Sequence, residues 1–259
     1  MNKSLIYSKV PEVTIFFWII KVLCTTVGET AADFLNTNLN LGLNGTTVIV
    51  GILLVVMLFF QFRARKYVPG IYWLVVVLLS VFGTLITDNL TDNLGVSLLT
   101  TTIVFSIALA IVFAVWYMSE KTLSIHSIYT TKREAFYWLA ILFTFALGTA
   151  AGDLLAERLA LGYLLSAVLF AGVIALVTVA HLRFKLNAVL AFWVAYILTR
   201  PLGASLGDYF SQLPDDGGLG LGTIGTSAIF LIAIFITVAY LTLTKKDAVA
   251  IEAPVASTD

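Results

Sequence analysis

The sequence predicts an all-α membrane protein whose eight transmembrane helices form four helical hairpin repeats, all oriented alike in one compact bundle. The chain of 259 residues is 60% apolar and 12% charged, with a mean hydropathy of +1.00. A soluble domain is about half apolar and about a quarter charged. Eight apolar runs are each long enough to cross a hydrocarbon core, which takes about 20 helical residues. A motif that occurs four times also supports this fold.

This motif is an aromatic–tryptophan pair, followed ten residues after the tryptophan by a glycine and five residues later by an aspartate. The copies start 55, 65 and 55 residues apart. Repetition at such a spacing dictates the architecture, because each copy folds as one supersecondary unit. The pairs that open the copies are Phe17-Trp18, Tyr72-Trp73, Tyr137-Trp138 and Phe192-Trp193.

The apolar runs justify the helices in chain order. We expect helices over residues 11–35, 45–62, 70–90, 96–118, 135–155, 162–182, 188–211 and 221–244. Runs of this length without alternation exclude strands as the main element. Turn-forming residues fill 36–45, and Pro and Gly fill 211–222. The predicted organisation is an N-terminus 1–10, repeats 11–66 and 67–118, a polar connector 119–134, repeats 135–185 and 186–246, and a disordered tail 247–259.

The basic residues predict the orientation. Twelve of the fifteen lie before the first run or after an even-numbered run, and therefore on one side of the membrane. Basic residues mark the cytoplasmic side of short loops, so both termini are predicted to be cytoplasmic. Repeats that share one orientation are related by an axis along the membrane normal.

The repeated tryptophans and glycines favour structural roles. Each tryptophan lies near the cytoplasmic start of its helix, where an interfacial aromatic belt is expected and a ligand-stacking role is the alternative. Small residues four apart let another helix approach closely. We therefore expect tight helix packing at the small-residue pairs Gly28/Ala32, Gly83/Thr87, Gly148/Gly152 and Gly203/Gly207. The interfacial tryptophans would be Trp18, Trp73, Trp138 and Trp193.

The repeated aspartates are the candidate ion-binding residues. Each lies about 22 Å of helix rise beyond its tryptophan, in the outer half of the membrane. A carboxylate there costs a few kcal/mol unless it has a partner, water or a proton. The residue four positions earlier lies on the same helix face and carries oxygen in three repeats. The predicted set is Asp33, Asp88, Asp153 and Asp208 with Glu29, Thr84 and Thr149. The alternative is that each aspartate caps its own helix.

Two cations also fall within predicted helices. Lys21 either neutralises an acid or extends its ammonium to the cytoplasmic surface. Arg200 lies deeper and is expected to pair with an acid, and the following Pro201 is expected to kink its helix. These two residues are the predicted charge partners of the acids.

Other chemistry is excluded by what the sequence lacks. The single cysteine, Cys24, excludes an internal disulfide and a metal–thiolate cluster. His126 and His181 fall in cytoplasmic connectors, where we expect solvated or interfacial side chains. No phosphate-binding loop, dinucleotide fingerprint or HExxH motif occurs. We therefore expect no enzyme, no required cofactor and no nucleic-acid partner.

The stretches GETAADFL, GTLITDNL, GTAAGDLL and TRPLGASLGD carry a family resemblance. They resemble bacterial membrane proteins built from four tandem two-helix repeats of unknown function, each with a tryptophan. The resemblance covers residues 9–244 and implies an eight-helix protein of the bacterial inner membrane. It implies no activity.

The acids therefore carry the functional prediction. Hard divalent ions such as Mn²⁺ or Mg²⁺ prefer oxygen ligands, so we expect a secondary transporter of a small cation, coupled to protons through the same carboxyls. One alternative is a transporter of an organic anion or other small solute that uses Arg200 and Lys21. Another is a structural or assembly protein without transport. The expected partners are the lipid bilayer and a bound divalent cation, and a homo-oligomer of the chain is a further alternative.

Overall fold

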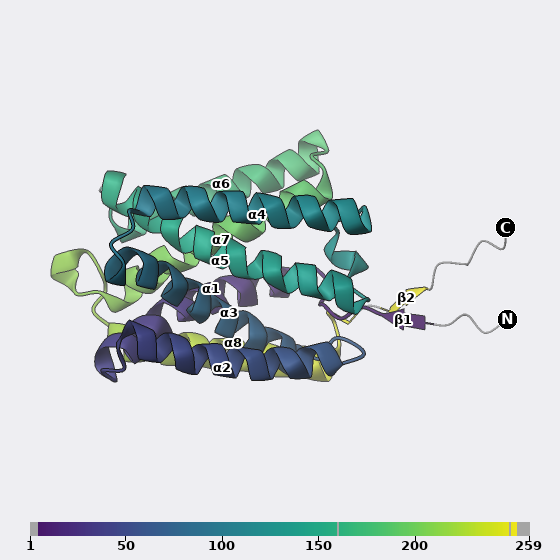
Figure 1. Cartoon of the computed structure of the whole chain (residues 1–259), viewed down its shortest axis with the longest axis horizontal. Helices are drawn as coiled ribbons and strands as arrows, with labels where there is room; N and C mark the ends of the chain where they lie inside the picture. Colours follow the sequence, from purple (N-terminus) through teal and green to yellow (C-terminus); the bar gives the residue numbers. More distant parts are fainter. Residues whose placement is uncertain (1–4, 160, 249, 253–259) are drawn as a thin grey trace.

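The computed structural model describes residues 5–159, 161–248 and 250–252, and Figure 1 shows its helices running nearly parallel. Among the described residues, eight helices are long and apolar enough to cross a membrane. They are α1 (Ile15–Asp33), α2 (Gly42–Arg63), α3 (Pro69–Asp88), α4 (Leu98–Glu120), α5 (Thr131–Leu159), α6 (Tyr163–Phe184), α7 (Ala188–Ser211) and α8 (Gly222–Thr244). The predicted all-α membrane fold is thus confirmed. The start of α1 and the end of α8 lie at the same end of the bundle (Figure 1). Most basic residues fall at this end, which we call the basic end. The repeated aspartates lie towards the C-terminal ends of α1, α3, α5 and α7, and we call that opposite end the acidic end.

The odd-numbered helices form a closed ring. Helix α1 packs against α3 and α7, and α5 packs against the same two helices. Each even-numbered helix packs outside this ring on the odd helix of the next repeat, so that α2 lies on α3, α4 on α5, α6 on α7 and α8 on α1. The share of buried residues is 50% or more in the odd spans and 22% or less in the even spans. The hairpins therefore interlock, and the even helices present their apolar surface outwards.

The repeated glycines explain how the ring closes. Gly28 lies against Ser80 of α3, and Gly203 lies against Thr25 of α1. In every repeat the contacted residue is three positions before the glycine of the next repeat, and the remaining contacts are Gly83 with Phe145 and Gly148 with Arg200. A Cβ atom at any of the four glycines would come closer than 3.0 Å to that side chain. Small residues therefore set the spacing of the ring, which has four-fold pseudosymmetry.

The second glycines of the small-residue pairs pack less closely than the first. A Cβ atom added to Gly152 would lie 3.1 Å from the Cβ of Pro201, and one added to Gly207 would lie 3.3 Å from the Cβ of Glu29. The tight packing predicted at Gly152 therefore differs from the structure in degree, because its neighbour is the ring of a proline that would have to shift by only a few tenths of an ångström. Of these two glycines of α5, Gly148 packs more closely against α7, because the added atom would lie 2.5 Å from Arg200.

The aromatic pairs fill the inside of the ring near the basic end. The first aromatic of each pair contacts the tryptophan of the next repeat, with ring centroids 5.6 Å apart for Phe17 and Trp73 and 5.7 Å apart for Phe192 and Trp18. The other two contacts, at 5.3 and 6.2 Å, are Tyr72–Trp138 and Tyr137–Trp193.

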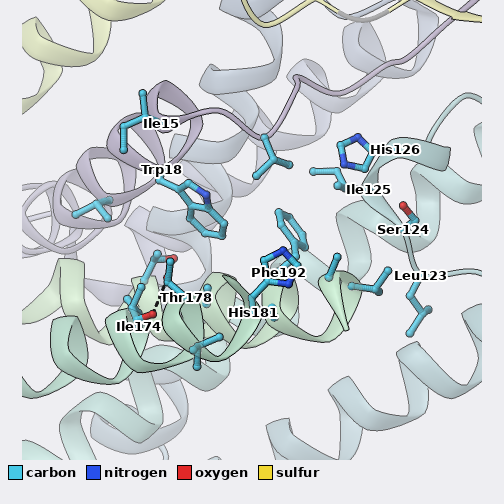
Figure 2. Close-up of a pocket in the computed structure, with 18 of the residues that line it drawn as sticks. Ile15, Trp18, Leu123, Ser124, Ile125, His126, Ile174, Thr178, His181 and Phe192 are labelled. Atoms are coloured by element: carbon cyan, nitrogen blue, oxygen red, sulfur yellow. Dashed lines mark hydrogen bonds between the residues drawn. The ribbon is translucent and has the colours of Figure 1, made fainter. Parts of the chain in front are cut away.

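The interfacial aromatic belt predicted for the four tryptophans is wrong for three of them. Trp73, Trp138 and Trp193 are buried, because each indole packs into the ring rather than facing lipid. Trp18 is half-buried, and it lines a cavity between α1, α6 and α7 (Figure 2).

The ends of the helices and the tail differ from the sequence prediction. Helix α5 begins at Thr131, inside the predicted connector, and short π-helices η1 (Phe34–Asn38) and η2 (Asn89–Asn93) prolong α1 and α3. Turns of 3-10 helix, η3 (Ile125–Ser127) and η4 (Pro214–Asp216), lie in two connectors. Pro201 lies within α7 without ending it.

Part of the tail is ordered, where the sequence predicts disorder. Strand β2 (Ala250–Glu252) pairs antiparallel with β1 (Leu5–Tyr7). Asp247 is buried and its Oδ2 accepts a 2.6 Å hydrogen bond from the Tyr67 hydroxyl. Residues 249 and 253–259 of the predicted tail lie outside the described residues.

A buried ion pair joins the N-terminal segment to α5. The Nζ of Lys9 lies 2.6 Å from Oε2 of Glu134, which is fully buried. The other carboxylate oxygen of Glu134 accepts a 2.9 Å hydrogen bond from Gln61 of α2. Because both oxygens are satisfied, the charge is tolerated inside the basic end.

Candidate functional site

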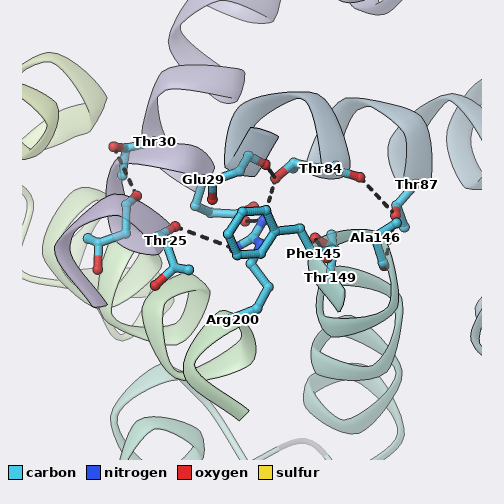
Figure 3. A network of polar contacts seen from close by, with 12 residues as sticks. Thr25, Glu29, Thr30, Thr84, Thr87, Phe145, Ala146, Thr149 and Arg200 are labelled. Atoms are coloured by element: carbon cyan, nitrogen blue, oxygen red, sulfur yellow. Dashed lines mark hydrogen bonds and ion pairs between the residues drawn. The ribbon is translucent and has the colours of Figure 1, made fainter. Parts of the chain in front are cut away.

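A polar network occupies the interior of the ring towards the acidic end (Figure 3). Arg200 of α7 is fully buried, and its Nη2 lies 2.7 Å from Oε2 of Glu29 on α1. The same nitrogen donates to the hydroxyl of Thr84 on α3, and Nη1 donates to the backbone oxygen of Thr25 at 3.4 Å. The guanidinium therefore links three helices of the ring, and its expected pairing with an acid is present.

Three carboxylates gather beside this guanidinium. Glu29, Asp33 and Asp208 each offer an oxygen, and these oxygens lie within 4.8 Å of one another. Glu29 and Asp33 are four residues apart, so they share one face of α1. Asp208 approaches from α7 because the helices meet closely there, with the α-carbon face of Gly207 against Glu29. We call these three residues the carboxylate cluster.

The other two repeated aspartates lie apart from the carboxylate cluster. Asp88 and Asp153 line a separate pocket of about 360 Å³, together with Thr91 and Asp92. The four aspartates therefore share the acidic end of the ring without forming a single four-oxygen site.

Local capping does not account for two of these aspartates. Asp33 and Asp88 are the residues that precede η1 and η2, and neither side chain makes a capping hydrogen bond there. Both helices continue into the π-helical turn through their backbone. The carboxyls are thus left to interact with other groups at the acidic end of the ring.

Thr84 and Thr149 do not join the carboxylate cluster. The hydroxyl of Thr84 donates to the backbone oxygen of Ser80 at 3.1 Å while it accepts from Arg200. The hydroxyl of Thr149 donates to the backbone oxygen of Phe145 at 3.1 Å. Thr84 therefore positions the guanidinium, and the role of cation ligand predicted for these two threonines has no support in this arrangement.

Lys21 lies deeper in the ring, towards the basic end. Its side chain is fully buried, and its Nζ is 4.1 Å from the ring centroids of both Phe145 and Tyr196. No hydrogen-bond partner reaches this nitrogen among the described residues. The alternative in which the ammonium extends to the membrane surface is wrong. Lys21 faces the ring axis, and the aromatic pairs fill that axis between Lys21 and the basic end.

The sequence predicts that Arg200 pairs with an acid, but it predicts neither the contact of Arg200 with Thr84 nor the aromatic contacts of Lys21, although the repeats contain a signal for both. Arg200 occupies the position three before the glycine, which is the position that meets the preceding repeat. Lys21 and Tyr196 each lie seven residues before their glycine. Aligning the copies as a closed ring would have placed them at the same level of the axis.

A family described as a repeat of unknown function (DUF347) matches the chain four times, over residues 16–67, 71–122, 136–187 and 191–247. These four matches coincide with the four interlocked helix pairs. No curated protein and no solved structure matches the chain. The matched residues cover most of the sequence, and the chain therefore belongs to this family of tandem membrane repeats.

Proposed function

We propose that the protein is a secondary transporter of a small divalent cation such as Mn²⁺ or Mg²⁺. The observation that carries this proposal is the carboxylate cluster, whose three oxygens lie within 4.8 Å of one another inside a membrane-spanning ring. Carboxylates buried in a membrane are costly, and they commonly mark ion or proton pathways. Oxygen-only donors favour hard cations over soft ones.

The charge balance of the cluster supports a cationic substrate. Three carboxylates face one guanidinium, and that guanidinium forms its ion pair with Glu29. A divalent cation would offset the remaining negative charge. Protons on the same carboxyls would do so in its absence, which supports coupling of cation movement to protons.

Glu29 is shared between the guanidinium and the cluster, and this suggests how binding is communicated. A cation that draws Glu29 towards Asp33 and Asp208 weakens the Glu29–Arg200 ion pair. Arg200 then depends on Thr84 and on the Thr25 carbonyl, which belong to neighbouring helices. Loading of the site would thereby alter how α1, α3 and α7 are held together.

An organic-anion substrate is less well supported by the same contacts. Both terminal nitrogens of Arg200 already bind groups of the protein, and Lys21 is fully buried between two aromatic rings. An incoming anion would have to displace Glu29 and would meet the carboxylate cluster. The arrangement therefore favours a cation.

The test is cation binding and flux with purified protein in proteoliposomes. We expect Asp33→Asn and Asp208→Asn to weaken Mn²⁺ binding at least about ten-fold, the effect of losing about 1.4 kcal/mol. Asp215→Asn is the matched control, because Asp215 is exposed and lies outside the cluster. Unchanged Mn²⁺ and Mg²⁺ binding and flux in Asn variants of all four repeated aspartates would overturn the proposal and favour a structural role.

A further inference from the structure

A cavity beside Trp18 is separate from the carboxylate cluster, because none of the three cluster residues lines it. It has a volume of about 590 Å³ and lies between α1, α6 and α7, with the connector 123–126 across its basic end (Figure 2). Along α7 it extends from Ala188 to Leu202, which is roughly 21 Å of helix rise. Half of a hydrocarbon core measures about 15 Å, so the cavity reaches through the depth of one leaflet.

The cavity exists because the third repeat lacks the bulky side chains that fill this position in the second repeat. Phe113 and Trp116 of α4 cover Trp193, with ring centroids 4.9 and 5.9 Å away. The equivalent residues of the next repeat, at the same positions within the matched stretches, are Thr178 and His181 of α6.

The side chains at this position differ in exposure from one repeat to the next. The first repeat has Gln61 where the second has Trp116, and both side chains are fully buried. His181 is only half-buried and Thr178 is exposed. Trp18 consequently loses the cover that the buried tryptophans have.

The walls of the cavity match an amphiphile that enters sideways from the membrane. Most lining side chains are apolar, and the exposed rim residues Ile15 and Thr178 show that the cavity opens between α1 and α6. Three polar lining residues, Ser124, His126 and His181, lie at the basic end. The other two, Thr178 and Thr199, donate their hydroxyls to backbone oxygens of their own helices. An apolar tail with a polar head at that end would match this distribution.

The mouth of the cavity favours an anionic head. Exposed Lys121 precedes the connector that crosses it, and exposed Arg183 and Lys185 follow His181. Two acids adjoin these cations. Glu12 is next to the lining residue Val13, and Glu120, which precedes Lys121, is already paired with Lys132 and Arg133. His181 donates from Nδ1 to the Leu186 carbonyl at 2.8 Å, since a carbonyl can only accept, and this leaves Nε2 for another partner.

We propose that this cavity binds one acyl chain of an anionic phospholipid from the leaflet at the basic end, with its phosphate beside Lys121, Arg183 and Lys185. The site does not depend on the proposed cation transport. Its ligand is recognised by an apolar slot of leaflet depth and by the positive charge at the mouth. The chain would supply the cover that Phe113 and Trp116 give to Trp193.

Trp18 reports on occupancy, because it is the tryptophan in contact with the cavity. The full chain is reconstituted in phosphatidylcholine nanodiscs that contain a rising fraction of phosphatidylglycerol with brominated acyl chains. We expect quenching to saturate at a low fraction of the brominated lipid and to disappear in Trp18→Phe. Brominated phosphatidylcholine should quench only in proportion to its bulk fraction.

Three variants separate a built site from general contact with lipid. Thr178→Phe with His181→Phe restores bulky cover and should abolish the saturable quenching, whereas Val179→Phe, on the exposed face of α6, should leave it unchanged. Arg183→Gln with Lys185→Gln keeps the walls intact and should weaken the preference roughly five-fold for each charge removed.

Several results would overturn the proposal. Equal and linear quenching by both lipids would mean ordinary lipid contact, and equal saturation by both would remove the role of charge. Quenching of Trp18 by aqueous iodide but not by brominated lipid would mean a water-filled vestibule. If a second copy of the chain covers the cavity instead of a lipid, the quenching of Trp18 will be lost and the protein will form a dimer at low lipid-to-protein ratio.

Discussion

Gly203 of α7 lies against Thr25 of α1, and this contact closes the ring that the first, second and third repeats leave open. The hydroxyl of Thr25 also donates to the backbone oxygen of Thr199 at 3.0 Å, so the two helices are joined both by close approach and by a hydrogen bond. The contact places Asp208 beside Glu29 and Asp33. Closure of the ring and assembly of the carboxylate cluster therefore depend on the same pair of helices.

The closing contact predicts the effect of adding one methyl group. Gly203→Ala would place a Cβ atom within 3.0 Å of Thr25, so α1 and α7 must separate. We expect the free energy of unfolding in detergent to fall by about 1–3 kcal/mol, the usual effect of overpacking. Gly172→Ala in α6 is the control, because nothing lies within 4 Å of the added atom. Equal stability of the two variants would contradict close packing at Gly203.

The ion pair between Arg200 and Glu29 predicts a stability loss together with a gain in cation affinity. Arg200→Met leaves Glu29 without its guanidinium, and breaking a buried pair costs about 3–5 kcal/mol. Mn²⁺ can then replace the lost charge, so its dissociation constant should fall. The double variant Arg200→Met with Glu29→Gln should regain stability and lose the affinity gain. A Mn²⁺ titration followed by thermal unfolding measures both effects.

Part of this arrangement follows from the repeat spacing alone. The four copies predict eight helices and the glycine contacts, since a small residue at one position in every repeat requires a close neighbour. The order of packing does not follow, because in a bilayer both the outer and the inner faces of a helix are apolar. Polarity therefore could not show that α2 lies on α3, nor that Trp73 and Trp138 point inwards.

The positions of the predicted cation ligands likewise follow partly from the repeat and partly from the assembled ring. Glu29 and Asp33 lie one turn apart on one ring helix, and Asp208 lies on the adjacent ring helix. The three residues therefore come together. Asp88 and Asp153 lie on the opposite helices and line their own pocket. Only the order of the helices around the axis separates these two groups, and that order is a property of the assembled ring.

Removing the charge of Lys21 is expected to affect stability in the opposite direction to removing the charge of Arg200. Its ammonium has aromatic contacts but no hydrogen-bond partner among the described residues, so burial costs much of what the contacts contribute. Lys21→Met keeps the volume and removes the charge, and we expect unchanged or higher stability. Lys21→Glu should be destabilised strongly, because a carboxylate would face the negative faces of Phe145 and Tyr196. Unfolding midpoints in one detergent compare the three proteins, and strong destabilisation of Lys21→Met would contradict this account.

The buried contact between Asp247 and Tyr67 predicts that docking of the tail depends on pH. Burial raises the pKa of Asp247 above its ordinary value, although the Tyr67 hydrogen bond acts in the opposite direction. Burial chiefly raises the pKa of Tyr67 as well, so its hydroxyl remains a donor at neutral pH. Because the docked carboxyl holds its proton more tightly than the undocked one, docking is strongest below the ordinary aspartate pKa. It weakens as pH rises through the raised value.

Hydrogen exchange at residues 245–248, corrected for the intrinsic effect of pH on exchange, measures this dependence. We expect protection to fall as pH rises from about 4, the ordinary aspartate pKa, through the raised value. Asp247→Asn should remove the pH dependence, because the amide stays neutral while retaining an oxygen that accepts from Tyr67. Tyr67→Phe should lower protection at every pH, because the 2.6 Å hydrogen bond is lost and Asp247 keeps its burial. Protection that rises with pH in the unaltered protein would mean that the charged carboxylate is the docked form, so that the tail would be held by ion pairing instead of by burial of a protonated acid.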